Sequence, residues 1–142
     1  MTFCDDIRYE IGNKVSYMGV YRSELFAENY PLLLPKFALA IHYTQGIDLP
    51  RPAVKIRVFY EPDAGEVVEL ATLEMPENAE PKAGEFSGDL VAASFEVVFS
   101  PLNVPGPGLL RARAYREGAE IRLGSLPFRQ ANRAGEQAAA GG

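Results

Sequence analysis

The chain has 142 residues, of which 47% are hydrophobic, and it carries a formal net charge of −5. This length fits one domain, the apolar content excludes a chain that is disordered throughout, and the acidic balance argues against nucleic-acid binding, which requires a basic surface. A single cysteine and a single histidine exclude an intrachain disulfide and the two-histidine zinc motif HExxH.

The amino terminus lacks the basic start and apolar run of a signal peptide. No window of the sequence approaches the roughly 18 apolar residues of a membrane span. We therefore expect a cytoplasmic protein without a membrane partner.

Short runs rich in Val, Ile, Phe and Tyr alternate with polar residues along the chain, and glycines and prolines separate them. This pattern predicts strands joined by turns. Residues 2–10 and 15–21 flank Gly12 and Asn13, which both tolerate positive φ, and so predict a β-hairpin. Prolines punctuate residues 22–36, which predict a crossover containing at most a short edge strand.

Two strongly alternating runs follow, at residues 36–44 and 53–61. Period two sends their larger apolar side chains to one face, which should be the core. The expected inward residues are Phe37, Leu39, Ile41, Tyr43, Val54, Ile56, Val58 and Tyr60. A turn at residues 61–66 then leads to a strand over 66–75, although as an isolated peptide this run could also form a helix.

Residues 76–88 are polar and contain two prolines, which predicts a long, mobile loop. The runs at 94–102 and 109–118 alternate again and are separated by a loop at 103–108. Their expected inward side chains are Phe95, Val97, Phe99, Leu110, Ala112 and Ala114. In the last run, at 121–128, the apolar residues change parity, so we predict a β-bulge at Gly124–Ser125. The bulge would bring four side chains into the core: Ile121, Leu123, Leu126 and Phe128.

About eight strands with little helix predict an all-β fold in which two antiparallel sheets pack face to face as a sandwich. We expect a single domain over residues 1–129. Residues 130–142 lack aromatic and branched apolar side chains, which predicts a disordered tail.

Four stretches of the sequence resemble an uncharacterised family of small bacterial proteins: FCDDIR, GNKVSYMGVY, LPKFALAIHY and PGPGLLRARAYREGAEIRLGSLPF. The resemblance extends to about Arg129 and implies an immunoglobulin-like β-sandwich. The family has no assigned activity, so the resemblance implies no catalytic residues.

The opening stretch FCDDIR combines residue types that enzymes use, namely Cys4, Asp5, Asp6 and Arg8. Consecutive strand residues point to opposite faces, so these side chains cannot all converge. Strand parity places Cys4, Asp6 and Arg8 on one face and Phe3, Asp5 and Ile7 on the other. Neighbouring aspartates would raise the pKa of the Cys4 thiol, which is the wrong direction for a nucleophile. We interpret the stretch as a structural hairpin.

Three other features suggest chemistry but have simpler interpretations. Loop-end acids could bind calcium, but no DxDxDG spacing is present, so solvated turn acids are favoured; the acids are Asp5, Asp6, Asp63 and Glu66. His42 could pair in space with Cys4 or Asp6, but the sequence gives no evidence for such a pair. The terminal AAAGG has the form of a conjugation tail, whereas a sandwich is not the fold of ubiquitin-like modifiers.

Four cations occupy predicted outward positions on two strands: Lys55, Arg57, Arg111 and Arg113. If these strands are neighbours, the cations cover one sheet face, and we call them the basic stripe. Like charges on adjacent strands are destabilising unless they are neutralised. Either acids of the chain (Glu61, Glu69 or Glu96) neutralise the basic stripe, or an acidic partner or a phosphorylated ligand docks on it.

The sequence therefore predicts a non-catalytic interaction module of a cytoplasmic bacterial protein. It would recognise a protein partner through an edge strand or a sheet face, by strand addition or by self-association. The alternative is a protein that binds a small ligand or an anion at the basic stripe. Neither an enzyme nor a cofactor is expected, because no nucleophile–base pair, metal set or phosphate loop stands out.

Overall fold

The computed structural model describes residues 1–79 and 86–131, and within them the chain consists of strands without a helix. The predicted all-β fold is confirmed, and the run at 66–75 forms a strand. In chain order the strands are β1 (Thr2–Cys4), β2 (Asp6–Glu10), β3 (Lys14–Met18), β4 (Leu25–Ala27), β5 (Leu32–Leu34), β6 (Phe37–Gly46), β7 (Val54–Pro62), β8 (Val68–Met75), β9 (Phe86–Ser87), β10 (Leu90–Phe99), β11 (Leu102–Val104), β12 (Gly108–Arg116) and β13 (Ala119–Gln130). No helix in this part of the chain has the length and apolar character needed to cross a membrane.

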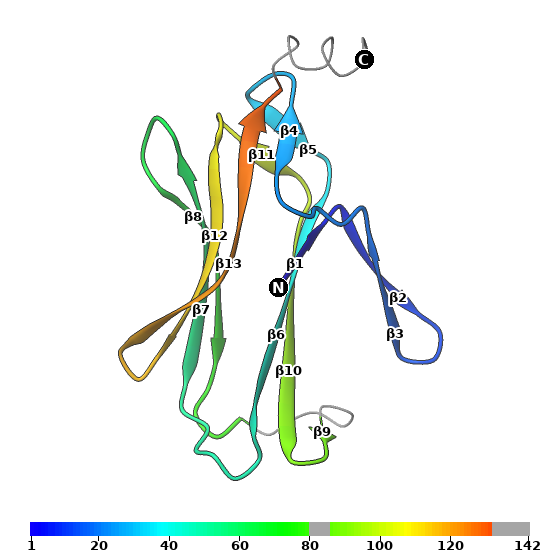
Figure 1. Ribbon diagram of the computed structural model, residues 1–142, viewed down its shortest axis with the longest axis vertical. Helices are drawn as coiled ribbons and strands as arrows, with labels where there is room; N and C mark the ends of the chain where they lie inside the picture. The colour runs from blue at the N-terminus through cyan, green and yellow to red at the C-terminus, as the bar shows by residue number, and fades with distance from the viewer. Residues whose placement is uncertain (80–85, 132–142) are drawn as a thin grey trace, which may run out of the picture.

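Two larger sheets lie face to face (Figure 1). A four-stranded sheet has the order β1-β6-β10-β9, and a five-stranded sheet has the order β4-β13-β12-β7-β8. Strand pairs β2–β3 and β5–β11 form two additional small sheets, which is one reason why the strands outnumber the eight expected. The arrangement is consistent with a β-sandwich.

One strand pairing differs from the expected antiparallel sheets. Strand β4 pairs with β13 in parallel, with Leu25 opposite Phe128. The predicted crossover at 22–36 thus contains two short strands, β4 and β5, where at most one was expected. The alternation of buried Leu25, exposed Phe26 and buried Ala27 shows why β4 forms, since its two inward side chains join the core.

The core lies between the two larger sheets. The expected inward side chains of β6, β7 and β12 are buried, apart from half-buried Tyr43. Aromatic rings connect the layers: Phe128 lies 6.0 Å from Phe37 of the opposite sheet and packs edge-on against Tyr60 at 5.5 Å, measured between ring centroids. Edge-on and tilted pairs at these distances are favourable aromatic contacts.

The bulge in β13 lies at Leu123, one residue before the predicted position. Ala112 of β12 pairs with Gly124 and Arg113 pairs with Arg122, so Leu123 has no counterpart. Leu126 and Phe128 are fully buried and Leu123 is partly buried, but Ile121 is exposed. The prediction was therefore wrong for Ile121. This residue lies near the β12–β13 turn, where the two strands extend away from the opposite sheet (Figure 1).

Parts of two predicted segments fall outside the described residues. These are residues 80–85 of the predicted mobile loop and residues 132–142 of the predicted tail, including AAAGG. At the end of the loop, Phe86–Ser87 form β9. Gln130, expected to begin the tail, is the last residue of β13.

Candidate functional site

Strands β7 and β12 are neighbours, so the basic stripe occupies one outer sheet face. Arg57 lies directly opposite Arg113, while Lys55 and Arg111 lie opposite aromatic residues. The assumption that the two cationic strands are adjacent is therefore correct.

Each cation of the stripe has an acidic partner on the same face. The ion pairs are Lys55–Glu74 at 3.9 Å, Arg57–Glu69 at 3.1 Å, Arg111–Glu61 at 3.1 Å and Arg113–Glu120 at 3.1 Å. Two of the three expected partner acids are present, whereas Glu96 lies on the other sheet. An anion that docked here would have to compete with carboxylates already in place.

Hydrogen bonds reinforce the centre of this face. A hydrogen bond from the Thr72 hydroxyl and the neighbouring Arg57 both lower the pKa of Glu69. Glu69 in turn raises the pKa of Arg57, whose guanidinium also lies 5.9 Å from the ring centroid of Tyr115. Arg113 is buried although it carries a charge. These contacts indicate that the charges of the basic stripe are neutralised within the protein and that the stripe has a structural role.

The opening stretch does not form a nucleophilic site. The Cys4 side chain is fully buried and lies in a small cluster with Ile7, Ala38 and Ala40. A bend at Asp5 interrupts the strand, so Ile7 packs with Cys4. The strand-parity prediction, which placed Ile7 on the opposite face from Cys4, was wrong for this reason. Burial, followed by the charges of nearby acids, raises the pKa of the Cys4 thiol, which disfavours the thiolate.

The candidate calcium-binding acids make separate contacts. A carboxylate oxygen of Asp6 lies 2.7 Å from the Lys36 ammonium, and this contact holds the pKa of Asp6 below its usual range. The Asp5 carboxylate accepts a hydrogen bond from the Tyr21 hydroxyl. Within residues 1–79 and 86–131, no group of three or more His, Cys, Asp or Glu side chains could hold a metal ion.

His42 connects the four-stranded sheet to the hairpin. Its Nδ1 lies 3.1 Å from Ser94 Oγ, and its Nε2 lies 3.2 Å from the Tyr17 hydroxyl. Neither Cys4 nor Asp6 is among these partners. The contacts do not match a serine hydrolase, in which the serine bonds to Nε2 and a carboxylate to Nδ1, because here Ser94 lies at Nδ1 and a tyrosine at Nε2. Sequence reasoning missed both partners because they come from distant strands.

The hairpin β2–β3 leaves the sandwich and extends away from both larger sheets (Figure 1). The turn contains Gly12 at φ 87° and Asn13 at φ 57°, so the predicted hairpin is confirmed. At its base, Ile7 and Tyr17 pack against Ala38 and Ala40 on the outer face of β6. These two alanines were expected to face outward, and they are buried because the hairpin covers them.

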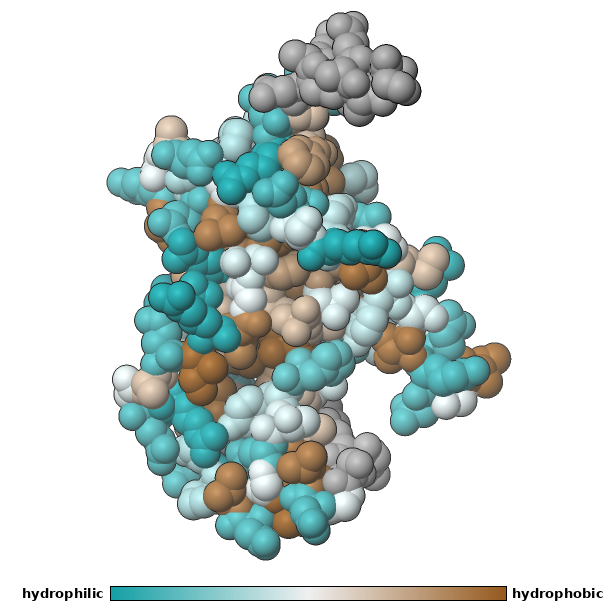
Figure 2. All heavy atoms as spheres, in the orientation of Figure 1, coloured by the Kyte–Doolittle hydropathy of each residue, from teal (hydrophilic) through white to brown (hydrophobic). Residues whose placement is uncertain are grey.

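Beyond this base, the hairpin exposes large apolar side chains. Ile11 at the turn is 96% exposed and Tyr9 is 72% exposed. Val15 of β3, which pairs with Tyr9, is exposed as well, whereas exposed Met18 pairs with Asp6 at the base, on the opposite face of the hairpin. Figure 2 shows the hairpin standing off the body of the molecule, with a hollow beneath it. We call Tyr9, Ile11 and Val15 the hairpin patch.

Comparison of the chain with protein-family models, with curated proteins and with solved structures finds no match. The family resemblance of the sequence and the immunoglobulin-like topology therefore stay predictions.

Proposed function

We propose that the protein is a non-catalytic interaction module that binds a protein partner through the hairpin patch. The observation that carries this proposal is the contrast between the two halves of the hairpin. Its base is packed against the sandwich, whereas its distal half presents apolar side chains to solvent.

Polar contacts also hold the hairpin in place. Asp6 at its base pairs with Lys36, Tyr9 donates a hydrogen bond to Glu96, and Tyr17 contacts His42. A recognition element that is already ordered loses less conformational entropy on binding. The anchored hairpin therefore presents a preformed surface to which a partner can bind.

The composition of the hairpin patch supports contact with a protein. Aromatic residues are enriched in the buried centres of interfaces, and contiguous exposed apolar residues mark interaction sites. Strands β2 and β3 pair only with each other among the described strands, so their outer edges are also open to an added strand. The partner we propose has an apolar concave surface that takes Ile11, and a strand edge beside it.

An immunoglobulin-like class of sandwich is part of the same proposal. Its support is the resemblance of the sequence together with two facing sheets that enclose an aromatic core. An experimental structure whose strands superimpose on an immunoglobulin domain would establish the class, and a different strand order would exclude it.

Site-specific photo-crosslinking in the native cell tests the function. A photoreactive amino acid is placed at Ile11, and in a control protein at Val67, which is exposed in the β7–β8 turn region. We expect a discrete adduct from position 11 that position 67 does not give. Adduct mass distinguishes a second copy of the chain from another protein.

Matched substitutions complete the test. Ile11→Asn should remove binding of the crosslinked partner, because it places an amide in the apolar contact, whereas Val67→Asn should leave binding unchanged. No specific adduct from position 11, or equal binding by both variants, would contradict the proposal.

Anion binding at the basic stripe has less support than the hairpin. Each of the four cations already has a carboxylate within 4 Å. Binding of an anion would therefore require the loss of existing ion pairs.

A further inference from the structure

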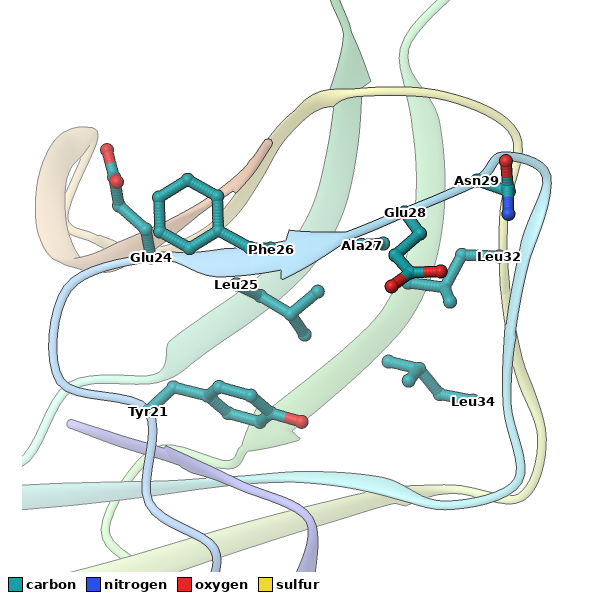
Figure 3. A pocket seen from close by; sticks show the side chains of 9 residues that line it. All are labelled: Tyr21, Glu24, Leu25, Phe26, Ala27, Glu28, Asn29, Leu32 and Leu34. Carbon is teal, nitrogen blue, oxygen red and sulfur yellow. The ribbon is translucent and has the colours of Figure 1, made fainter. Parts of the chain in front are cut away.

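A surface pocket of about 440 Å³ lies at one end of the sandwich, within the segment from Tyr21 to Leu34. Strand β4 forms one side of it and β5 another (Figure 3). Apolar and aromatic side chains line its inner surface: Tyr21, Leu25, Leu32 and Leu34. Its volume falls in the range of about 300–1,000 Å³ that is usual for small-molecule sites.

The Tyr21 ring is a fixed part of this lining. It stacks on Phe37 of the core with ring centroids 5.8 Å apart, and its hydroxyl donates to Asp5. Burial, followed by the Asp5 hydrogen bond, raises the pKa of the Tyr21 hydroxyl, which keeps the phenol neutral. The pocket therefore contains a preformed neutral aromatic wall.

Among the described residues, the charged side chains that line the pocket itself are acidic. Glu24 and Glu28 are the charged residues that line the pocket, and no Lys, Arg or His does so. Figure 3 shows the Glu28 carboxylate directed toward Leu32, on the same side of β4 as Leu25, whereas Phe26 points the other way. Glu24 lies 3.7 Å from Arg129, but no cation of the described residues lies within ion-pair distance of Glu28.

We propose that this pocket binds a small organic ammonium ion with an apolar body. The apolar body would cover Leu25, Leu34 and the Tyr21 ring, and the ammonium group would lie beside the Glu28 carboxylate, next to Leu32. The carboxylate attracts the positive charge directly, and the apolar body contacts the aliphatic side chains and the aromatic ring. A carboxylate ligand of the same shape would be repelled by both glutamates. The site is independent of the hairpin and of the partner that the hairpin binds.

Three probes that share a hexyl chain test the proposal: hexyltrimethylammonium, hexanol and hexanoate. Each is titrated into the full-length isotope-labelled protein while amide shifts are recorded by NMR. We expect saturable shifts for the ammonium probe that concentrate in residues 21–34, weaker binding of hexanol and no binding of hexanoate. These titrations use the wild-type protein, so their result does not depend on whether a variant folds.

A charge-neutralising pair of variants tests the role of Glu28. Glu28→Gln should weaken binding of hexyltrimethylammonium about threefold to fivefold, as for an exposed ion pair. Glu66→Gln, which neutralises an exposed acid in the turn before β8, should leave the affinity unchanged. The proposal is overturned if hexanol or hexanoate binds as tightly as the cation, if the shifts map elsewhere, or if Glu28→Gln binds like the wild type.

Discussion

At the scale of single residues, the side chains with the strongest chemical associations make structural contacts. Cys4 fills a small cluster under the hairpin, and His42 connects Ser94 to Tyr17 across two sheets. Residue type alone therefore gives little guidance to chemistry in this chain, because the surroundings decide what each group can do.

Cys4 should be unreactive in the folded protein. Its side chain is buried and its thiol has a raised pKa, so both access and thiolate formation are disfavoured. We expect alkylation by iodoacetamide at pH 8 to be at least about 100-fold slower than in denaturant, because reaction must wait for an opening of the structure. A native rate close to that of the unfolded chain would show that Cys4 is accessible.

The ion pairs of the basic stripe should differ in their contribution to stability. The Arg113 side chain is 8% exposed, whereas that of Lys55 is 51% exposed. Glu120→Gln leaves a buried guanidinium without its carboxylate and should lower the free energy of unfolding by about 1–2 kcal/mol. Glu74→Gln should cost less than about 0.5 kcal/mol, as for an exposed pair. Urea unfolding measures both, and equal losses would contradict the assigned burial.

Strand parity predicted the outward positions of the basic stripe correctly, because β7 and β12 pair with each other in an unbroken register. The same reasoning failed at Ile7, because the bend at Asp5 interrupts the strand and brings Ile7 to the same side as Cys4. The partners of His42 were not predictable, since they come from strands whose pairing no local pattern specifies.

At the scale of the elements, the hairpin is divided into a packed base and an exposed distal half. Ile7→Ala removes apolar contacts with Ala38 and Ala40 and should lower the free energy of unfolding by about 2 kcal/mol. Ile11→Ala, at a nearly fully exposed position, should change it by less than about 0.5 kcal/mol. Urea unfolding of the two variants measures the difference, and similar stabilities would mean that the hairpin is not anchored through Ile7.

Long alternating strands and the Gly12–Asn13 turn were predicted because each carries its own local signal. The three-residue strands β4, β5 and β11 were not, since three residues between prolines and polar positions are too few to show a period. The bulge of β13 was predicted from the parity change but placed one residue late, because Leu123 and Gly124 are both compatible with it.

At the scale of the whole molecule, the contact between the two layers depends on few large side chains. Phe128 contacts both Phe37 and Tyr60 and is fully buried. Phe128→Ala should therefore lower the free energy of unfolding by about 3–5 kcal/mol. The same substitution at exposed Phe26 should cost less than about 0.5 kcal/mol. A thermal or urea denaturation series checks the pair, and a small loss at Phe128 would contradict the packing of the layers.

The strands and the layered core were predictable from the period-two runs, but the order of the strands within the sheets was not. The parallel pairing of β4 with β13 joins residues about one hundred positions apart. Nothing in either segment specifies the other, because backbone hydrogen bonds carry no sequence information. The pocket between β4 and β5 was missed for the same reason.

The two ends of the hairpin segment meet where it leaves the sandwich. The backbone N–H of Tyr21 donates to Phe3 O at 2.9 Å, and that of Asp5 donates to Met18 O at 2.9 Å. The hairpin thus leaves and rejoins the sandwich at one place, and the two larger sheets form without strand pairing to its distal part. The sequence of the distal half of the hairpin, from Tyr9 to Val15, can therefore change during evolution and alter which partner the protein binds, while the sandwich that carries the hairpin stays the same.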